Sequence, residues 1–385
     1  EMSRGLGDVY KRQSYEKVLE VSDFFKENLQ NNNFENNGIV YIGMDAGWAK
    51  MSDEQLADIV RHCKANGQKA GIYFTPFSDW GKDPEAYING NSGYKCKDAY
   101  LYANGKTQNM VAGGLAMDPT HPAIKERIRE TAERFKRLGY EYIKIDFLTH
   151  GCAEADYYYD PEVQTGMQAY NKGMAYLLEQ MEGMYITMAI SPLFPSQYAH
   201  SRRIACDAWA GIGDTEYTLN SLTYGWWLNQ VYTYNDPDHL LLEPVSDGEN
   251  RARITSGVIT GIFMNGDDLS CISGIQVAKD KARKFLTNKD INAIAKMGKS
   301  FRPVNGNMDG ADFLFMHDTG KEVYLAAFNY SGYDLTYDLP LSRLGLRESS
   351  TYKAKELWSG KEVKFKKNVR VCIPKKDVLV FRITR

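Results

Sequence analysis

The sequence predicts a (β/α)8 barrel followed by a C-terminal antiparallel β-sandwich. Over residues 14–303, apolar runs of strand length alternate with amphipathic stretches of helical spacing, which is typical of a parallel sheet with crossover helices. The number of repeats, close to eight, favours a closed barrel over an open sheet. After Pro303 short alternating strands are separated by turn residues, which indicates a sandwich over 304–385.

The first half of the barrel opens on a helix, because Val18, Val21, Phe25 and Leu29 recur near helical spacing before an Asn-rich stretch and Gly38. Short apolar runs that end in polar or turn residues predict the strands. The expected elements are a helix over 14–30, a strand over 38–45, a helix over 53–67, a strand over 68–74, a long loop, a helix over 122–139 and a strand over 140–147.

The same alternation continues through the second half. The expected elements are a helix over 166–181, a strand over 184–191, a short strand over 202–207, a helix rich in Tyr and Trp, a strand over 231–236 and a helix passing into a strand over 254–265. The sandwich is predicted from seven short runs of alternating residues between 312 and 383.

The composition excludes several classes of protein. Lys and Arg number 47 against 49 Asp and Glu, so the net charge of −2 argues against nucleic-acid binding. The chain has no apolar run near the ~18 residues of a membrane span. Its six cysteines are scattered without metal-binding spacing, and neither a dinucleotide fingerprint nor a P-loop follows any predicted strand.

Carboxylates follow the predicted barrel strands. They are Asp45, Asp146, Asp207, Asp236 and Asp238. The active site of a barrel lies at the C-terminal ends of its strands, so these acids are expected to converge there. The alternative for any one of them is that it caps the next helix or starts a turn.

Two of these acids have charged neighbours that suit glycosidase chemistry. Lys144 shares a strand face with Asp146, and a cation there would keep that carboxylate ionised, as a nucleophile requires. Asp207 has Arg203 four residues before it and Trp209 two residues after it, and apolar walls would raise its pKa and suit it as a general acid. The alternative for Arg203 and Asp207 is a structural ion pair.

A set of ordered motifs covering almost all of residues 14–300 resembles the α-galactosidase clan, glycoside hydrolase families 27 and 36. The motifs are YIGMDAGW (41–48), GIY (71–73), MDPTHP (117–122), YIKID (142–146), RIACD (203–207), NDPDHL (235–240) and IFMNGDDLS (262–270). The C-terminal sandwich agrees with the same resemblance.

The resemblance implies a retaining exo-glycosidase that hydrolyses terminal α-D-galactosyl residues of oligosaccharides or glycoconjugates. It implies Asp146 as the nucleophile and Asp207 as the acid/base. The implied sugar-binding residues are Asp45, Trp48, Tyr73, Lys144, Ser191, Arg203 and Asp238. The expected partner is a carbohydrate, with no metal, no cofactor, no nucleic acid and no membrane span. A homo-oligomer, and a cytoplasmic or exported location, stay open.

Departures from the family leave alternatives open. Ala46 stands where many members carry a second acid, so one contact to O4 or O6 of the sugar is lost. On the fifth strand either Ile190 or Ser191 occupies the position facing O2, and Ser191 would suit an N-acetyl group. His239 replaces an expected apolar residue and is expected at the surface or beside the site. The alternatives are an α-N-acetylgalactosaminidase, a β-L-arabinopyranosidase and a non-catalytic sugar-binding barrel.

The start of the chain differs most from the family pattern. Residues 1–13 form a leader that is unrelated to the pattern after it, and the G-W-N-S-W strand that opens the family barrel is missing. A barrel without that strand would have an open seam with unpaired edges. We therefore expect reduced stability of this chain.

Overall fold

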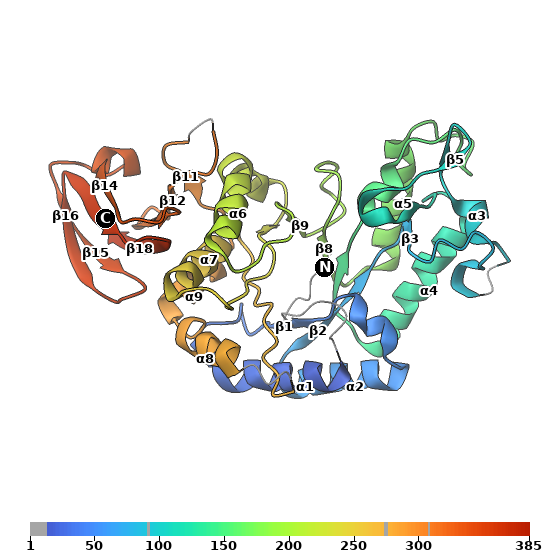
Figure 1. Ribbon diagram of the computed structural model, residues 1–385, viewed down its shortest axis with the longest axis horizontal. Helices are drawn as coiled ribbons and strands as arrows, with labels where there is room; N and C mark the ends of the chain where they lie inside the picture. Colours follow the sequence, from blue (N-terminus) through green and yellow to red (C-terminus); the bar gives the residue numbers. More distant parts are fainter. Residues whose placement is uncertain (1–13, 91–92, 273–275, 307–308) are drawn as a thin grey trace. The chain divides into compact units, whose positions relative to one another are not determined.

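The computed structural model describes residues 14–90, 93–272, 276–306 and 309–385, so the leader predicted over 1–13 lies outside the described residues (Figure 1). The chain forms two units. The first comprises the chain up to Gly47, Ala65–Gln68 and Arg203–Arg385, and the second comprises Trp48–Lys64 and Lys69–Arg202.

The second unit is built on parallel strands with crossover helices, as predicted. Strands β2 (Lys69–Phe74), β7 (Tyr142–Ile145) and β8 (Tyr185–Met188) pair in parallel, and β8 pairs with the start of β9 (Ser201–Arg203). Helices α4 (Pro122–Leu138) and α5 (Gly166–Gln180) connect these strands and pack against each other (Figure 1). Helix α2 (Asp53–Ala65) precedes β2.

The ends of helix α4 illustrate how the sequence sets these boundaries. The His121 ring accepts a hydrogen bond from the backbone N–H of Ala123, and Pro122 occupies the first turn, where its missing N–H costs nothing. At the other end Gly139 has φ +94°, a left-handed conformation that stops the helix directly before β7.

The loop expected between β2 and α4 contains short ordered elements. They are β3 (Ser78–Asp79), α3 (Cys96–Ala99), β4 (Tyr102–Ala103), β5 (Lys106–Thr107) and β6 (Leu115–Ala116). Strand β3 pairs with β6 and β4 with β5, both antiparallel. Two-residue strands are too short to give an alternating pattern, which is why the sequence did not predict them.

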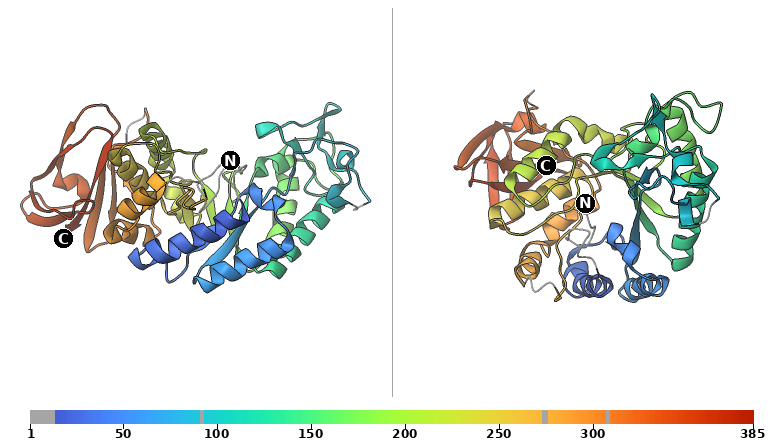
Figure 2. Two further views of the ribbon diagram at one scale, coloured as in Figure 1. Left: turned by 60° about the horizontal axis from the view of Figure 1, so that its bottom comes forward. Right: turned by 45° about the vertical axis from the view of Figure 1, so that its right-hand side comes forward.

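The first unit contains the remaining barrel elements. They are α1 (Tyr15–Phe24) with a π-helical extension (Phe25–Leu29), β1 (Tyr41–Gly43), α6 (Ile212–Gly225), β10 (Tyr234–Asp236), α7 (Asp247–Thr260), α8 (Gln276–Phe285) and α9 (Lys289–Lys296). Helix α1 lies beside α8, as both views in Figure 2 show, and Arg283 of α8 donates to the side chain of Asn28 at 3.0 Å. Short 3-10 helices occupy Gln30–Asn32, Ala46–Lys50, Ile88–Gly90, Val111–Gly113, Leu148–Cys152, Trp226–Gln230 and Leu341–Leu344.

Three predictions over residues 202–265 were wrong. Helix α7 begins at Asp247, seven residues before the predicted start at 254, because Ser246 and Glu249 form a capping box. The strand expected at the end of 254–265 is reduced to single parallel bridges at Gly261 and Asn265. Strand β9 also ends at Arg203, so Asp207 lies in the loop after the strand.

The C-terminal strands form an antiparallel sheet with one shared core (Figure 1, red). The strands are β11 (Arg302–Pro303), β12 (Leu314–Asp318), β13 (Glu322–Asn329), β14 (Leu335–Pro340), β15 (Thr351–Glu356), β16 (Glu362–Lys366), β17 (Asn368–Ile373) and β18 (Asp377–Thr384), in the order β11-β12-β13-β18-β15-β16-β17-β14. Alternate residues point inward. Leu325 of β13, for example, lies opposite Phe381 of β18, and both side chains are buried in this core.

Within the described part of the chain, helices long and apolar enough to cross a membrane are absent. The domain limits predicted at 14–303 and 304–385 stay predictions.

Candidate active site

A row of side chains crosses the parallel sheet of the second unit. Tyr73 of β2 is in register with Lys144 of β7, and Lys144 is in register with Thr187 of β8. Neighbours in register on parallel strands point to the same face of the sheet. The Lys144 Nζ atom lies 5.0 Å from the centre of the Tyr73 ring, so the aromatic face stabilises the cation.

Asp146 follows β7 directly and lies beside this row. Its Oδ2 atom is 3.4 Å from Lys144 Nζ, and the two side chains are only 7% and 2% exposed. Its Oδ1 atom accepts a hydrogen bond of 2.8 Å from the backbone N–H of Phe147. Lys144 and Asp146 are therefore paired, as the sequence predicted.

The backbone after these strands is strained at two non-glycine residues. Phe147 has φ +54° and Ile190 has φ +40°, both in the left-handed region. Such conformations cost of order 1–3 kcal/mol each and gather at functional sites. Here they redirect the chain immediately after Asp146 and immediately before Ser191.

Aromatic rings surround Phe147, and one of them was missed from the sequence. Trp80 lies edge-on to Phe147 with ring centres 4.6 Å apart, and its side chain is 40% exposed. Its indole N–H donates to the hydroxyl of Thr75 at 3.1 Å, which fixes the ring. An exposed, fixed indole suits stacking on a sugar ring. In the sequence Trp80 stands within the long loop, and that loop has no periodicity from which the position of the ring could be predicted.

In the first unit, Arg203 joins two predicted site carboxylates. One terminal nitrogen lies 3.2 Å from Oδ1 of Asp207, and the other lies 3.2 Å from Oδ1 of Asp238. The Arg203 and Asp238 side chains are buried, whereas that of Asp207 is 40% exposed. Arg203 therefore anchors an accessible carboxylate to a buried one.

Asp238 is held in its charged form. Burial opposes ionisation, but Arg203, His239 and the Ala208 N–H together keep the pKa of Asp238 well below its usual range. The Ala208 N–H donates to Oδ2 at 2.9 Å. Asp238 has φ +74°, a left-handed backbone, and its own N–H donates to Asp236 at 2.9 Å.

The electrostatic setting of Asp207 includes both burial and a cation. Burial of its carboxyl favours the neutral form, whereas the Arg203 guanidinium favours the charged form. The Trp209 side chain is 44% exposed and lies edge-on to the His239 ring. The raised pKa that the sequence predicts for Asp207 stays a prediction.

Arg253 of α7, which the sequence analysis missed, ties together the loops that carry these carboxylates. Its guanidinium is fully buried and donates to the carbonyl oxygens of Trp209 at 3.0 Å, His239 at 2.7 Å and Pro237 at 3.3 Å. Burial lowers the pKa of Arg253 to about 10, which still leaves it charged at neutral pH. One cation thus fixes the segments after β9 and after β10.

The remaining predicted residues have the following contacts. Asp45 is buried after β1 and accepts the Ala46 N–H at 2.8 Å. The Trp48 indole donates to the Tyr73 carbonyl at 2.8 Å and packs edge-on against Phe135 of α4. The Ser191 hydroxyl accepts from Arg202 at 3.0 Å.

Two groups of predicted residues are thus brought together. Tyr73, Lys144 and Asp146 form one in the second unit, and Arg203, Asp207 and Asp238 form the other in the first unit. The separation of Asp146 and Asp207 stays a prediction, as do the site roles.

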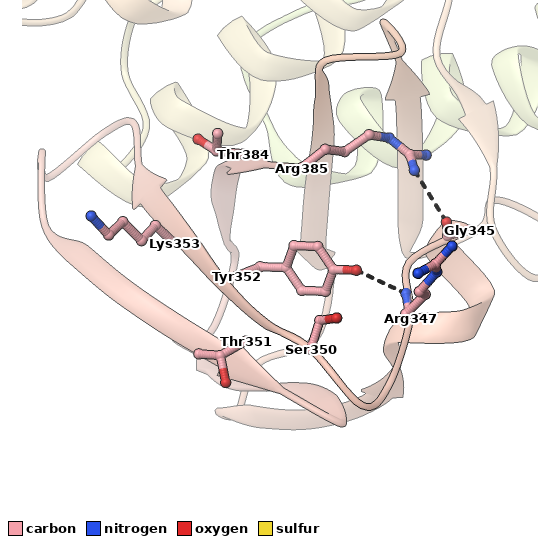
Figure 3. Close-up of a pocket in the computed structure, with 8 residues that line it drawn as sticks. All are labelled: Gly345, Arg347, Ser350, Thr351, Tyr352, Lys353, Thr384 and Arg385. Atoms are coloured by element: carbon pink, nitrogen blue, oxygen red, sulfur yellow. Dashed lines mark hydrogen bonds between the residues drawn. The ribbon is translucent and has the colours of Figure 1, made fainter.

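A hollow of about 610 Å³ lies in the C-terminal domain (Figure 3). Tyr352 points across it, and its hydroxyl accepts the backbone N–H of Arg347 at 2.9 Å. Thr384 and Arg385 also line it. None of the predicted site residues lines this hollow, so it is separate from the strand-end carboxylates.

Comparisons with known proteins bear on the fold of the chain. Residues 314–383 match the family model described as the alpha galactosidase C-terminal beta sandwich domain. The whole chain has the fold of barrel-plus-sandwich glycosidases. A family 27 β-L-arabinopyranosidase from Geobacillus stearothermophilus superposes with a TM-score of 0.75 at 13% identity, over 100% of this chain and 94% of that one.

Two α-galactosidases show the same fold. Alpha-galactosidase I from Mortierella vinacea has a TM-score of 0.66 at 12% identity, covering 99% of this chain and 96% of that one. The enzyme from Saccharomyces cerevisiae has a TM-score of 0.64 at 11% identity, covering 99% and 97%. The predicted fold, a (β/α)8 barrel followed by a β-sandwich, and the resemblance to the α-galactosidase clan are confirmed.

Proposed function

We propose that the protein is a retaining exo-glycosidase that removes terminal α-D-galactosyl residues from oligosaccharides or glycoconjugates. The observation that carries this proposal is the buried pair at the end of β7, where Lys144 Nζ lies 3.4 Å from Asp146 Oδ2. A buried carboxylate beside a cation and an aromatic ring is suited to attack an anomeric carbon while excluding water.

The proposed reaction has two displacements. In the first, a carboxylate oxygen of Asp146 bonds to the anomeric carbon, the glycosidic C–O bond breaks, and Asp207 gives its proton to the leaving oxygen. In the second, Asp207 takes a proton from water, whose oxygen bonds to the anomeric carbon and releases Asp146. This sequence requires the two carboxyl groups to be about 5 to 5.5 Å apart.

The other predicted residues would hold the sugar. We assign Asp45 to the O4 and O6 hydroxyls, Tyr73 and Trp48 to the aromatic side of the pocket, and Ser191 to the region of O2. Arg203 and Asp238 would hold O2 and the acid/base. A neutral sugar needs several such polar contacts within a largely apolar cup.

The test is hydrolysis of nitrophenyl α-galactoside, α-N-acetylgalactosaminide, β-L-arabinopyranoside and α-glucoside. We expect release from the α-galactoside, with the α-anomer of the sugar formed first in an NMR time course. Asp146→Asn and Asp207→Asn should each lose activity. Asp118→Asn is the matched control, because Asp118 is a buried carboxylate that holds Thr120 and the backbone of Tyr159.

Three outcomes would overturn the proposal. They are an Asp146→Asn variant that still turns over, an inverted product, and a wild-type protein that binds sugars but hydrolyses none of the four glycosides. The last outcome would favour a non-catalytic sugar-binding barrel.

A second candidate substrate is a β-L-arabinopyranoside, which has the ring stereochemistry of galactose without C6. Ala46 favours it, because the side chain next to Asp45 cannot bind a C6 hydroxyl. The structure of a β-L-arabinopyranosidase has the same fold. An α-N-acetylgalactosaminide is favoured only by the small Ser191 side chain, and the same panel of glycosides distinguishes the three.

A further inference from the structure

His239 contacts the carboxylate that anchors Arg203. Its Nδ1 atom lies 3.1 Å from Oδ1 of Asp238, the same oxygen that lies 3.2 Å from Arg203. The second oxygen of Asp238 accepts the Ala208 N–H. Because Asp238 is charged, it can only accept, so Nδ1 of His239 carries the hydrogen that it donates.

The imidazole ring is fixed on several sides. The side chain is 3% exposed, and the Trp209 ring lies edge-on at 5.6 Å. A Cβ atom added at Gly266 would come within 2.6 Å of His239 Cδ2, so the ring packs tightly against that glycine. Arg253 holds the backbone carbonyl of His239 at 2.7 Å. The ring therefore has one orientation, with Nδ1 aimed at Asp238.

We propose that His239 is a positioning residue for the acid/base: it holds Asp238, Asp238 holds Arg203, and Arg203 orients the carboxyl of Asp207. This inference rests on the proposed function, in which Asp207 gives and takes the proton. A fully satisfied chain of charged hydrogen bonds is rigid, and proton transfer depends on the angle and distance of the carboxyl to the leaving oxygen.

Removing the His239 donor would loosen this chain of hydrogen bonds. The charged groups around His239 and Asp238 are Arg203, Asp207, Asp236 and Arg253, so without the imidazole Arg203 alone among the side chains described would bond Oδ1 of Asp238. With Oδ1 held only by Arg203 and Oδ2 by the Ala208 N–H, the Asp238 carboxylate could turn further about its Cβ–Cγ bond, and Arg203 would follow it. Asp207 would lose its fixed direction while its chemistry stayed intact.

Two substitutions at position 239 separate hydrogen bonding from packing. His239→Leu keeps much of the ring volume but has no donor. His239→Asn is smaller, but its side-chain nitrogen is attached to Cγ, as Nδ1 is in histidine, so it can donate to Asp238. His317→Leu is the control, because His317 lies in β12 of the sandwich and stacks on Phe301.

The readout is kcat/KM for two glycosides of the same sugar, one with a 2,4-dinitrophenyl leaving group and one with a methyl leaving group. The dinitrophenyl group needs little protonation to depart, whereas the methyl glycoside depends on the general acid, which contributes roughly 10²–10⁴-fold. We expect His239→Leu to lose at least about 10-fold more on the methyl glycoside than on the dinitrophenyl one. His239→Asn should recover most of that difference, and His317→Leu should show none.

Equal losses on both substrates, or a Leu variant that performs better than the Asn variant, would overturn the inference and leave His239 as a packing residue. The wild-type protein tests the proposed function separately. If it hydrolyses neither glycoside, the proposed function fails, and the inference fails with it.

Discussion

Lys144 of β7 and Asp146, the residue directly after that strand, form a buried ion pair of 3.4 Å. The alternation of side chains along β7 brings them to the same face of the sheet, and Asp146 Oδ1 accepts the Phe147 N–H in addition. The carboxylate is thus held by one charge and one backbone dipole. A carboxylate fixed in this way has the preorganisation on which electrostatic stabilisation depends.

The first prediction concerns this cation. Lys144→Met should lower kcat by about 100-fold or more, because one preorganised electrostatic partner of the reacting group is lost. Lys69→Met is the control. Its exposed ion pair with Glu141 should contribute only about 0–1 kcal/mol to stability and nothing to turnover. Steady-state kinetics on the best glycoside of the panel checks both, and a Lys144→Met enzyme within 3-fold of wild type (roughly 0.7 kcal/mol) would contradict the assignment.

The strand that carries this pair was predictable from the sequence alone. YIKID is an apolar run interrupted at one position, and the structure places its strand over Tyr142–Ile145. Gly139 marked the end of the preceding helix. The strand expected over 202–207 was wrong after Arg203, because Asp207 lies in the loop that follows, where its side chain pairs with Arg203. Tertiary ion pairs of that kind leave no local pattern.

The supporting residues of the candidate site were less predictable. Arg253 stands in an ordinary amphipathic stretch, and only the fold places its guanidinium on three carbonyl oxygens of distant loops. His239 was noticed as a departure from the family, but its bond to Asp238 depends on the left-handed backbone of Asp238 and on the space left by Gly266. The sequence identifies the charged residues, but it does not predict their partners, because packing in the fold decides which groups meet.

The second prediction concerns Arg253. Arg253→Met keeps an apolar stem of similar length but leaves the carbonyl groups of Trp209 and His239 without this donor. Each buried polar group left unsatisfied costs about 1–3 kcal/mol, so the free energy of unfolding should fall by about 3 kcal/mol. Urea denaturation measures the loss. Arg283→Met, at an exposed position of α8, should change it by less than about 0.5 kcal/mol.

A loss no larger than that of the Arg283 variant would show that the Arg253 contacts are not needed to hold the two loops. Activity gives an independent check. Because Arg253 fixes the segments that carry Asp207 and Asp238, kcat should fall even at temperatures where the variant is fully folded.

The third prediction concerns sugar choice. Ala46→Asp places a second carboxylate beside Asp45, where the family often has one, and a hydrogen bond to a charged group contributes about 1.5–3 kcal/mol. The ratio of kcat/KM for the α-galactoside over the β-L-arabinopyranoside should therefore rise by roughly 10-fold or more. Ala46→Asn, which is similar in size and uncharged, is the matched control and should give a smaller rise. An unchanged ratio would mean that residue 46 does not face C6.

The last prediction concerns the pH dependence of stability. Asp267 is buried and accepts hydrogen bonds from the Leu242 N–H and from Asn265, yet burial raises its pKa to about 7. In the unfolded chain the carboxyl ionises near 4, so between about pH 4 and pH 7 the folded state binds one proton more than the unfolded state. The contribution of Asp267 to the free energy of unfolding should fall as pH rises through this window, by roughly 1.4 kcal/mol per pH unit, and should be constant above it.

Urea denaturation of wild type and Asp267→Asn at pH 4.5, 5.5, 6.5 and 8 gives this contribution as the difference between the two proteins. Asp268→Asn, at the adjacent carboxylate paired with Lys17, should leave the slope in place, and a difference that rises with pH would show that Asp267 is stabilised as an ion.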